Sequence, residues 1–167
     1  MSVAVRLTEE QFLSLPDAPG KQELLDGELI SLPPAKLIHG IIARRFFELL
    51  RKAVHESRVW YETGYRLKHG WLQPDVSVNW PDQPAGEWFE GSPMIAIEIA
   101  SRGNTDEEID QKIEAYLNGG AAEVWIVRPK TASMTVFRRD SAVRVTGVYE
   151  CEILAISVDV PRLVQVS

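Results

Sequence analysis

The sequence contains very little cysteine, since Cys151 is the only one among 167 residues. One thiol cannot form an intrachain disulfide or build a thiolate metal cluster. A metal site in this chain would therefore have to use oxygen and imidazole ligands, which narrows the expected metals towards Mg²⁺ or Mn²⁺.

Long apolar runs are also missing. No segment approaches the roughly 18 consecutive apolar residues that span a bilayer, and Met1 to Leu15 carries charged residues where a signal peptide would be apolar. We therefore expect no membrane partner and a cytoplasmic location. The content of hydrophobic residues (45%) and of charged residues (25%) is ordinary for a globular protein, and the length predicts a single domain over residues 1–167.

An excess of positive charge is absent as well. The net charge of -6 argues against a protein that coats nucleic acid through bulk electrostatics, because neutralising phosphates needs a basic surface. An acidic catalytic centre would itself contribute negative charge. Basic residues also gather locally, in one group of Arg44, Arg45, Arg51, Lys52 and Arg58 and a second of Arg66, Lys68 and His69. Charge alone therefore leaves binding of nucleic acid open.

The sequence predicts three helices among a larger number of strands. Capping boxes or three-to-four-residue apolar spacing predict helices at Thr8 to Pro16, Leu37 to Val54 and Thr105 to Leu117. Turn residues between apolar runs predict a hairpin at Glu23 to Leu32 around Asp26-Gly27, and a second hairpin made of Val59 to Leu67 and Trp71 to Asn79. Further strands are expected at Met94 to Ala100, Val124 to Val127, Met134 to Phe137, Val143 to Val145 and Ile153 to Ser157. The helix between the strands at Met94 and Val124 should make a right-handed crossover that leaves those two strands parallel.

Two carboxylates stand out in this pattern. Glu98 interrupts a run that is otherwise apolar on both faces, as is typical of a central strand, and a buried lone charge is costly unless a cation compensates it. Asp75 follows Pro74 at an irregular place in its strand, although an isolated Pro-Asp pair is more often a turn cap. On adjacent strands the two acids could share a divalent ion, which would supply the Lewis acid for phosphodiester hydrolysis.

Three further residues are candidates with an ordinary alternative beside each. Lys112 lies on the margin of its helix's apolar stripe, so it could turn inward to the acids or be a boundary lysine. Glu23 could be a further acid near the metal or a solvated acid at a strand start. His39 could contact phosphate or carry a proton, but packing beside Ala43 and Phe46 at the helix start is slightly favoured.

Several segments occur in an order that resembles the Uma-two family of restriction-endonuclease-like proteins, within the PD-(D/E)XK nuclease superfamily. These segments are Glu23 to Leu29, His39-Gly40, Pro74-Asp75, Glu98 to Ser101, Lys112 with Tyr116, and Val124 to Val127. The resemblance covers about Glu23 to Arg139. It implies an α/β (α+β) restriction-endonuclease-like fold, with a central mixed sheet flanked by helices and an N-terminal helix and hairpin. The expected core is a helix, a three-stranded meander, a crossover helix and a fourth, parallel strand.

The resemblance also implies residue roles. Asp75, Glu98 and the carbonyl of Ile99 would ligate Mg²⁺ (or Mn²⁺), and the substrate would be DNA, cut as by an endonuclease. The superfamily's lysine usually lies two residues after the acid, where this chain has Ala100. Lys112 is the candidate replacement, which would orient the attacking water or stabilise charge on the phosphate.

Other functions stay open at this stage. Ala100 and the acidic net charge are also compatible with a catalytically inactive nuclease-fold protein that binds DNA or acts as a scaffold. A metal-dependent hydrolase of RNA or small phosphoesters is a third interpretation. Since many nucleases cut two strands as dimers, a two-fold homodimer is a reasonable expectation.

Overall fold

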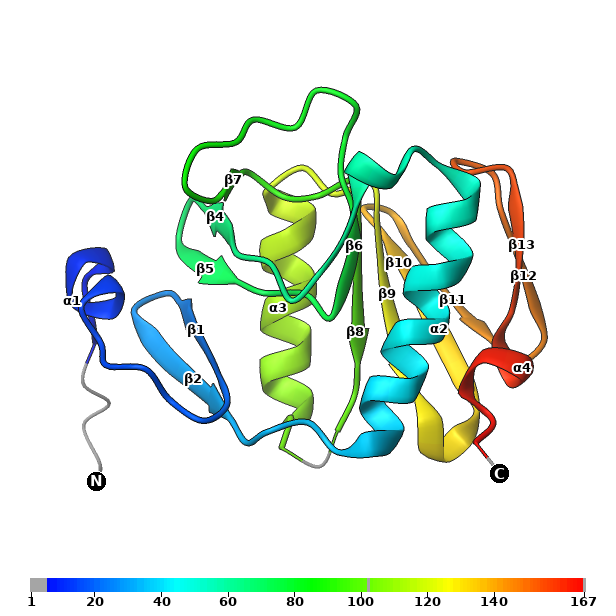
Figure 1. Ribbon diagram of the computed structural model, residues 1–167, viewed down its shortest axis with the longest axis horizontal. Helices are drawn as coiled ribbons and strands as arrows, with labels where there is room; N and C mark the ends of the chain where they lie inside the picture. Colours follow the sequence, from blue (N-terminus) through cyan, green and yellow to red (C-terminus); the bar gives the residue numbers. More distant parts are fainter. Residues whose placement is uncertain (1–5, 102, 167) are drawn as a thin grey trace.

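A computed structural model describes residues 6–101 and 103–166 of the chain. Its centre is a twisted sheet with helix α2 on one side and helix α3 on the other (Figure 1). The bounds are Leu37–Ala53 for α2 and Asp106–Asn118 for α3. Thr105 caps α3 through the predicted capping box. This arrangement confirms the mixed sheet flanked by helices.

The central sheet has six strands in the order β11-β10-β9-β8-β6-β3. Neighbours are antiparallel except β8 and β9, which are parallel and connected through α3. The predicted crossover is therefore confirmed. The bounds are Val59–Tyr61 (β3), Val76–Val78 (β6), Ile95–Ile99 (β8), Glu123–Arg128 (β9), Ser133–Arg138 (β10) and Ser141–Val145 (β11).

The alternation of side chains in β8 decides which helix each residue meets. Successive residues of a strand point to opposite faces. One face carries Ile95, Ile97 and Ile99, which belong to the same core cluster as Ile42, Phe46 and Leu50 of α2. The other face carries Ala96, which clusters with Ile109, Ile113 and Tyr116 of α3. Glu98 follows Ala96 in this alternation, so it faces α3.

A second sheet of five strands has the order β2-β1-β5-β4-β7. Its strands are Lys21–Leu25 (β1), Glu28–Leu32 (β2), Tyr65–Leu67 (β4), Gly70–Leu72 (β5) and Phe89–Glu90 (β7). The predicted hairpin of β1 and β2 is confirmed, and Asp26 and Gly27 at its turn have φ of 50° and 81°, as a type I′ turn requires. Pairing of β1 with β5 joins this hairpin to the other strands of the five-stranded sheet.

The second predicted hairpin forms, but neither of its long strands is continuous. Each breaks in the middle, so that β3 pairs with β6 while β4 pairs with β5. The two halves then join different sheets. The break has a local cause: Glu62 has a φ of 43°, and Pro74 has no N–H to give to a ladder.

The C-terminal region departs most from the predicted pattern. The predicted strand at Ile153 to Ser157 begins three residues too early, because residues 152–155 form the turn between β12 (Val148–Cys151) and β13 (Ile156–Asp159). The pattern also missed β12 and the short helix α4 (Val160–Val164). At the other end, α1 (Glu9–Leu13) has the predicted Thr8 capping box. Within the described ranges, no helix combines the length and the apolar character needed to cross a membrane.

Candidate active site

Asp75 and Glu98 lie beside each other at the centre of the main sheet. In the antiparallel register of β6 and β8, Val76 pairs with Ile97, so the next pair in the same register is Asp75 with Glu98. Residues directly opposite in an antiparallel pair point to the same face. Both acids are almost fully buried, with 3% and 8% of their surface exposed. The expected placement on neighbouring strands is therefore what the structure has.

Three donors surround the Asp75 carboxylate. Lys21 Nζ lies 3.0 Å from Oδ1, while the Ile99 N–H donates to Oδ2 at 2.7 Å and His39 Nε2 lies 3.2 Å from the same oxygen. Burial alone would raise the pKa of Asp75, but the Lys21 charge and the His39 hydrogen bond outweigh it and hold the pKa below its usual value. Asp75 is therefore ionised at neutral pH.

The N-terminal hairpin fixes the segment that precedes Asp75. Lys21 and Glu23 are two residues apart in β1, so their side chains share a face. Lys21 Nζ donates to the carbonyl of Gln73 at 2.8 Å, and the Gln73 N–H donates to Glu23 Oε2 at 2.7 Å. Gln73 lies between β5 and β6, where its backbone has no strand partner among the residues that the structure describes. The bonds to Lys21 and Glu23 take the place of strand pairing there, and they position Asp75.

Lys112 turns inward and contacts Glu23. Its Nζ lies 2.5 Å from Glu23 Oε1, and only 2% and 0% of the two side chains are exposed. Burial alone would lower the pKa of Lys112, but the charges of Glu98 and Glu23 outweigh it and raise this pKa. The interpretation of Glu23 as a solvated acid is wrong, because the hairpin carries it into the interior.

Glu98 has fewer stabilising contacts than Asp75. The Tyr116 hydroxyl donates to its Oε1 at 2.8 Å. Burial raises the pKa of Glu98 to about 7, since the charges of Lys112 and Lys21 offset the desolvation only in part. The metal-free site therefore combines one carboxylate that is ionised at neutral pH with one that holds its proton more tightly than it would in water.

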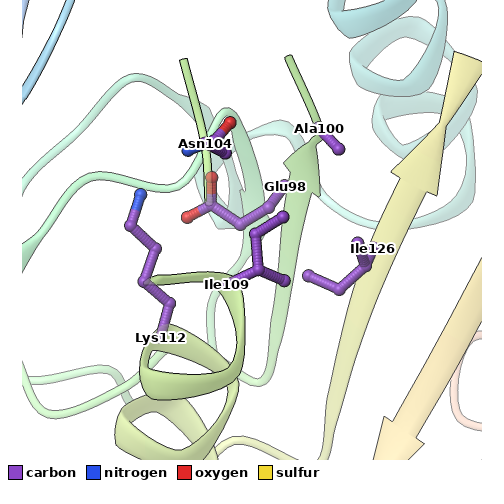
Figure 2. Close-up of a pocket in the computed structure, with 6 residues that line it drawn as sticks. All are labelled: Glu98, Ala100, Asn104, Ile109, Lys112 and Ile126. Atoms are coloured by element: carbon purple, nitrogen blue, oxygen red, sulfur yellow. The ribbon is translucent and has the colours of Figure 1, made fainter. Parts of the chain in front are cut away.

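A small cavity adjoins Glu98. Figure 2 shows Glu98 and Lys112 extending from β8 and α3 towards the same space. The cavity measures about 10 Å³, which is room for about one water molecule. Its other lining residues are Ala100, Asn104, Ile109 and Ile126. Ala100, where the superfamily has its lysine, and Lys112 thus border the same space.

Two residues of the site were misjudged or missed from the sequence. The preferred packing role of His39 is wrong, because its ring contacts Asp75 from the first turn of α2, and the hydrogen bond to Asp75 raises its pKa. Lys21 was not considered. The period-two alternation of a strand that contains Glu23 was the signal that could have identified it.

Three arginines of the two basic groups have partners within the chain. In the first, Arg45 Nη1 donates to the carbonyls of Leu163 and Gln165, and Arg58 Nε donates to the carbonyl of Asn79. In the second, Arg66 forms ion pairs with Glu9 and Glu90. The charge of Arg66 is thus offset by acids of the chain, whereas Arg45 and Arg58 keep theirs, because backbone carbonyls are neutral.

The donor set suits a hard divalent cation. Asp75, Glu98 and the Ile99 carbonyl would offer only oxygen atoms, and Mg²⁺ in proteins is commonly held by one or two carboxylates with several waters. Over residues 6–101 and 103–166, no group of three or more His, Cys, Asp or Glu side chains could hold a metal ion. These residues therefore fit an ion that keeps most of its water shell rather than one held in a closed protein cage.

The meander, the crossover through α3 and the paired acids together define a restriction-endonuclease-like fold. The family model of Uma2, described as "Putative restriction endonuclease", matches residues 9–160, so the chain belongs to this family, as the ordered motifs predicted. Among solved structures, the chain is similar to "a putative nuclease belonging to DUF820" from Anabaena variabilis, with a TM-score of 0.84 and 21% identity over 95% of this chain and 97% of the other. At that identity the likeness shows a shared fold. No curated protein matches the chain.

Proposed function

We propose that this protein is a Mg²⁺-dependent DNA endonuclease that hydrolyses phosphodiester bonds. The observation that carries the proposal is the buried pair of acids, Asp75 directly before β6 and Glu98 in the neighbouring strand β8. Membership in a family of nuclease-like proteins supports it. A pair of buried acids with no structural need for two charges is typical of a catalytic centre.

The residues of the site have separate proposed roles. Asp75, Glu98 and the Ile99 carbonyl would hold the ion, which when bound would polarise the phosphate and lower the pKa of a water molecule. Asp75 is already ionised, and its orientation is fixed by the Ile99 N–H. His39 Nε2, at 3.2 Å from Asp75 Oδ2, is the group best placed to hold a proton beside the ion.

Lys112 would supply the charge that Ala100 does not. It borders the same cavity as Glu98 and Ala100, and Glu23 holds it there through a buried ion pair. A fixed ammonium in a site that excludes water stabilises negative charge on a phosphate more strongly than it would in bulk solvent. Glu23 is then a positioning residue, because its two carboxylate oxygens hold the Lys112 ammonium and the Gln73 N–H.

Cleavage of plasmid DNA tests the proposal. Supercoiled DNA is incubated with wild type, Asp75→Ala, Lys112→Ala and the control Asp82→Ala, which changes an exposed loop acid. We expect Mg²⁺- or Mn²⁺-dependent nicking by wild type and Asp82→Ala, and at least a hundredfold slower nicking by Asp75→Ala and Lys112→Ala, as is usual when charge stabilisation is removed, about 10²–10³. Wild-type rates in Lys112→Ala would remove this residue from the mechanism.

The second candidate is a nuclease-fold protein that binds DNA or a protein partner without cleaving. Ala100 and the net charge of -6 favour it. A panel of duplex DNA, single-stranded RNA and a small phosphodiester separates the candidates. Binding of DNA without turnover of any substrate would support the inactive protein, and turnover of RNA or the small ester alone would reassign the substrate. Sedimentation of the protein with and without DNA tests the predicted homodimer.

A further inference from the structure

The ammonium of Lys21 lies within the group of acids at the candidate metal position. Its Nζ is 3.0 Å from Asp75 Oδ1 and 2.8 Å from the carbonyl oxygen of Gln73. The negative charges of Glu98 and Glu23 act on it as well. A carboxylate oxygen and a carbonyl oxygen, the two atoms that contact Lys21 Nζ, are also of the types that bind divalent ions. Asp75 is itself a proposed metal ligand.

The other lysine of the site has a different environment. Lys112 is 2% exposed and pairs with Glu23, which is itself fully buried. The Lys21 side chain is 14% exposed and belongs to the N-terminal hairpin, at the outer end of the five-stranded sheet. A flexible four-carbon chain that starts near the surface can withdraw its charge into water, whereas a buried one has no such route.

The balance of charge decides which lysine has to leave. The acids of the site are Glu23, Asp75 and Glu98, all buried. When all three are ionised, Lys112 and one divalent ion neutralise them, and the charge of Lys21 becomes surplus. Like charges only a few ångströms apart in a poorly solvated place repel each other strongly.

We propose that Lys21 is the resident cation of the metal-free site and that a divalent ion displaces its ammonium into solvent on binding. The inference rests on the proposed metal-dependent function and deepens it. Lys21 then sets the metal affinity of the site, and Asp75 never lacks a cation. Lys112 stays in place throughout.

Chemical labelling of the wild-type protein tests the displacement directly. Lysine amines are acetylated with and without saturating Mg²⁺, and the modified sites are measured by mass spectrometry. We expect labelling of Lys21 to increase several-fold with Mg²⁺, while buried Lys112 stays protected and exposed Lys68 reacts equally in both states. If calorimetry shows that Mg²⁺ is bound and Lys21 labelling does not change, displacement is refuted.

Calorimetric titration of Mg²⁺ into Lys21→Met supplies the second readout, with Lys68→Met as the matched control. Loss of the competing charge should lower the Kd of Lys21→Met at least about tenfold, since 1.4 kcal/mol of relieved repulsion corresponds to that factor. Lys68→Met should bind as wild type does, and binding by Lys21→Met alone would also support the proposal. An unchanged or weaker affinity in Lys21→Met would overturn it. Failure of all three proteins to bind Mg²⁺ or Mn²⁺ would instead overturn the metal site itself.

Discussion

Replacing Glu98 with glutamine should stabilise the metal-free protein at neutral and alkaline pH. The amide keeps the shape of the side chain and can still accept the hydrogen bond of the Tyr116 hydroxyl. It cannot ionise. In the wild type, burial raises the pKa of Glu98 from 4.5 to about 7, so ionising this residue costs more in the folded protein than in the unfolded chain.

The sign and the size of the effect follow from this difference. Between pH 4.5 and pH 7 the folded wild type retains a proton that the unfolded chain has lost, so its free energy of unfolding falls as the pH rises. Each pKa unit corresponds to about 1.4 kcal/mol. The penalty above pH 7 is therefore about 3 kcal/mol and vanishes near pH 4. For a chain of this size, Glu98→Gln should melt roughly 10 °C higher at pH 8.

Urea unfolding followed by circular dichroism, in buffers with a chelator at pH 4.5, 6 and 8, measures the effect. Asp75→Asn is the matched control with the opposite sign. The pKa of Asp75 is lowered in the folded protein, so its charge stabilises the fold above pH 4, and removing it should destabilise the protein at pH 8. Two results would refute the reasoning: Glu98→Gln less stable than wild type at pH 8, or a difference that stays constant with pH.

Adding metal at pH 8 should bring wild type close to the stability of Glu98→Gln and widen its lead over Asp75→Asn. An ion that binds only the folded state at 100 times its Kd stabilises wild type by about 2.7 kcal/mol. Glu98→Gln and Asp75→Asn each remove one proposed ligand charge, so their metal-induced shifts should be much smaller. Equal shifts in all three proteins would place any binding elsewhere.

Three other changes test how the surroundings support the site. Thr105→Ala removes the cap of α3 and should cost about 1 kcal/mol in urea unfolding, without altering Mg²⁺ affinity in calorimetry. Glu123→Ala leaves the buried Trp125 indole N–H without its acceptor at 3.0 Å, so we expect a loss of about 2 kcal/mol and an unchanged metal shift. Gly70→Ala would bring a Cβ to 2.2 Å from the Leu24 carbonyl oxygen, so β1 must move, and a thermal shift assay should show both a lower Tm and a smaller response to Mg²⁺.

Sequence patterns predicted the parts of the fold whose cause is local. The Asp26-Gly27 turn and the Thr105 capping box specify their own backbone geometry, and both are where they were expected. Glu98 could be predicted as a buried acid because its neighbours in the strand are apolar on both faces. In each case the residues that determine the structure lie within a few positions of it.

What the sequence could not predict depends on contacts between distant segments. The break in the second hairpin sends its two halves to different sheets, and nothing near Thr63 or Gln73 says which partner strand each half will find. The positions of Lys21 and His39 beside Asp75 follow from that outcome, since β1 and α2 reach the acid from 54 and 36 residues earlier in the chain. Contacts between such distant residues leave no pattern in the sequence around either of them.

The break in the hairpin is also the reason why a site exists here at all. A continuous ladder through Gln73 and Asp75 would use the Gln73 N–H and carbonyl for strand pairing. Because the chain leaves the ladder at Pro74, the Gln73 N–H and carbonyl instead bind Glu23 and Lys21. These bonds bring two charged residues of the five-stranded sheet next to Asp75. Asp75 thereby gains a cation, and Lys112 gains the acid that holds it beside Glu98. The same departure from regular structure thus positions Asp75 and both lysines.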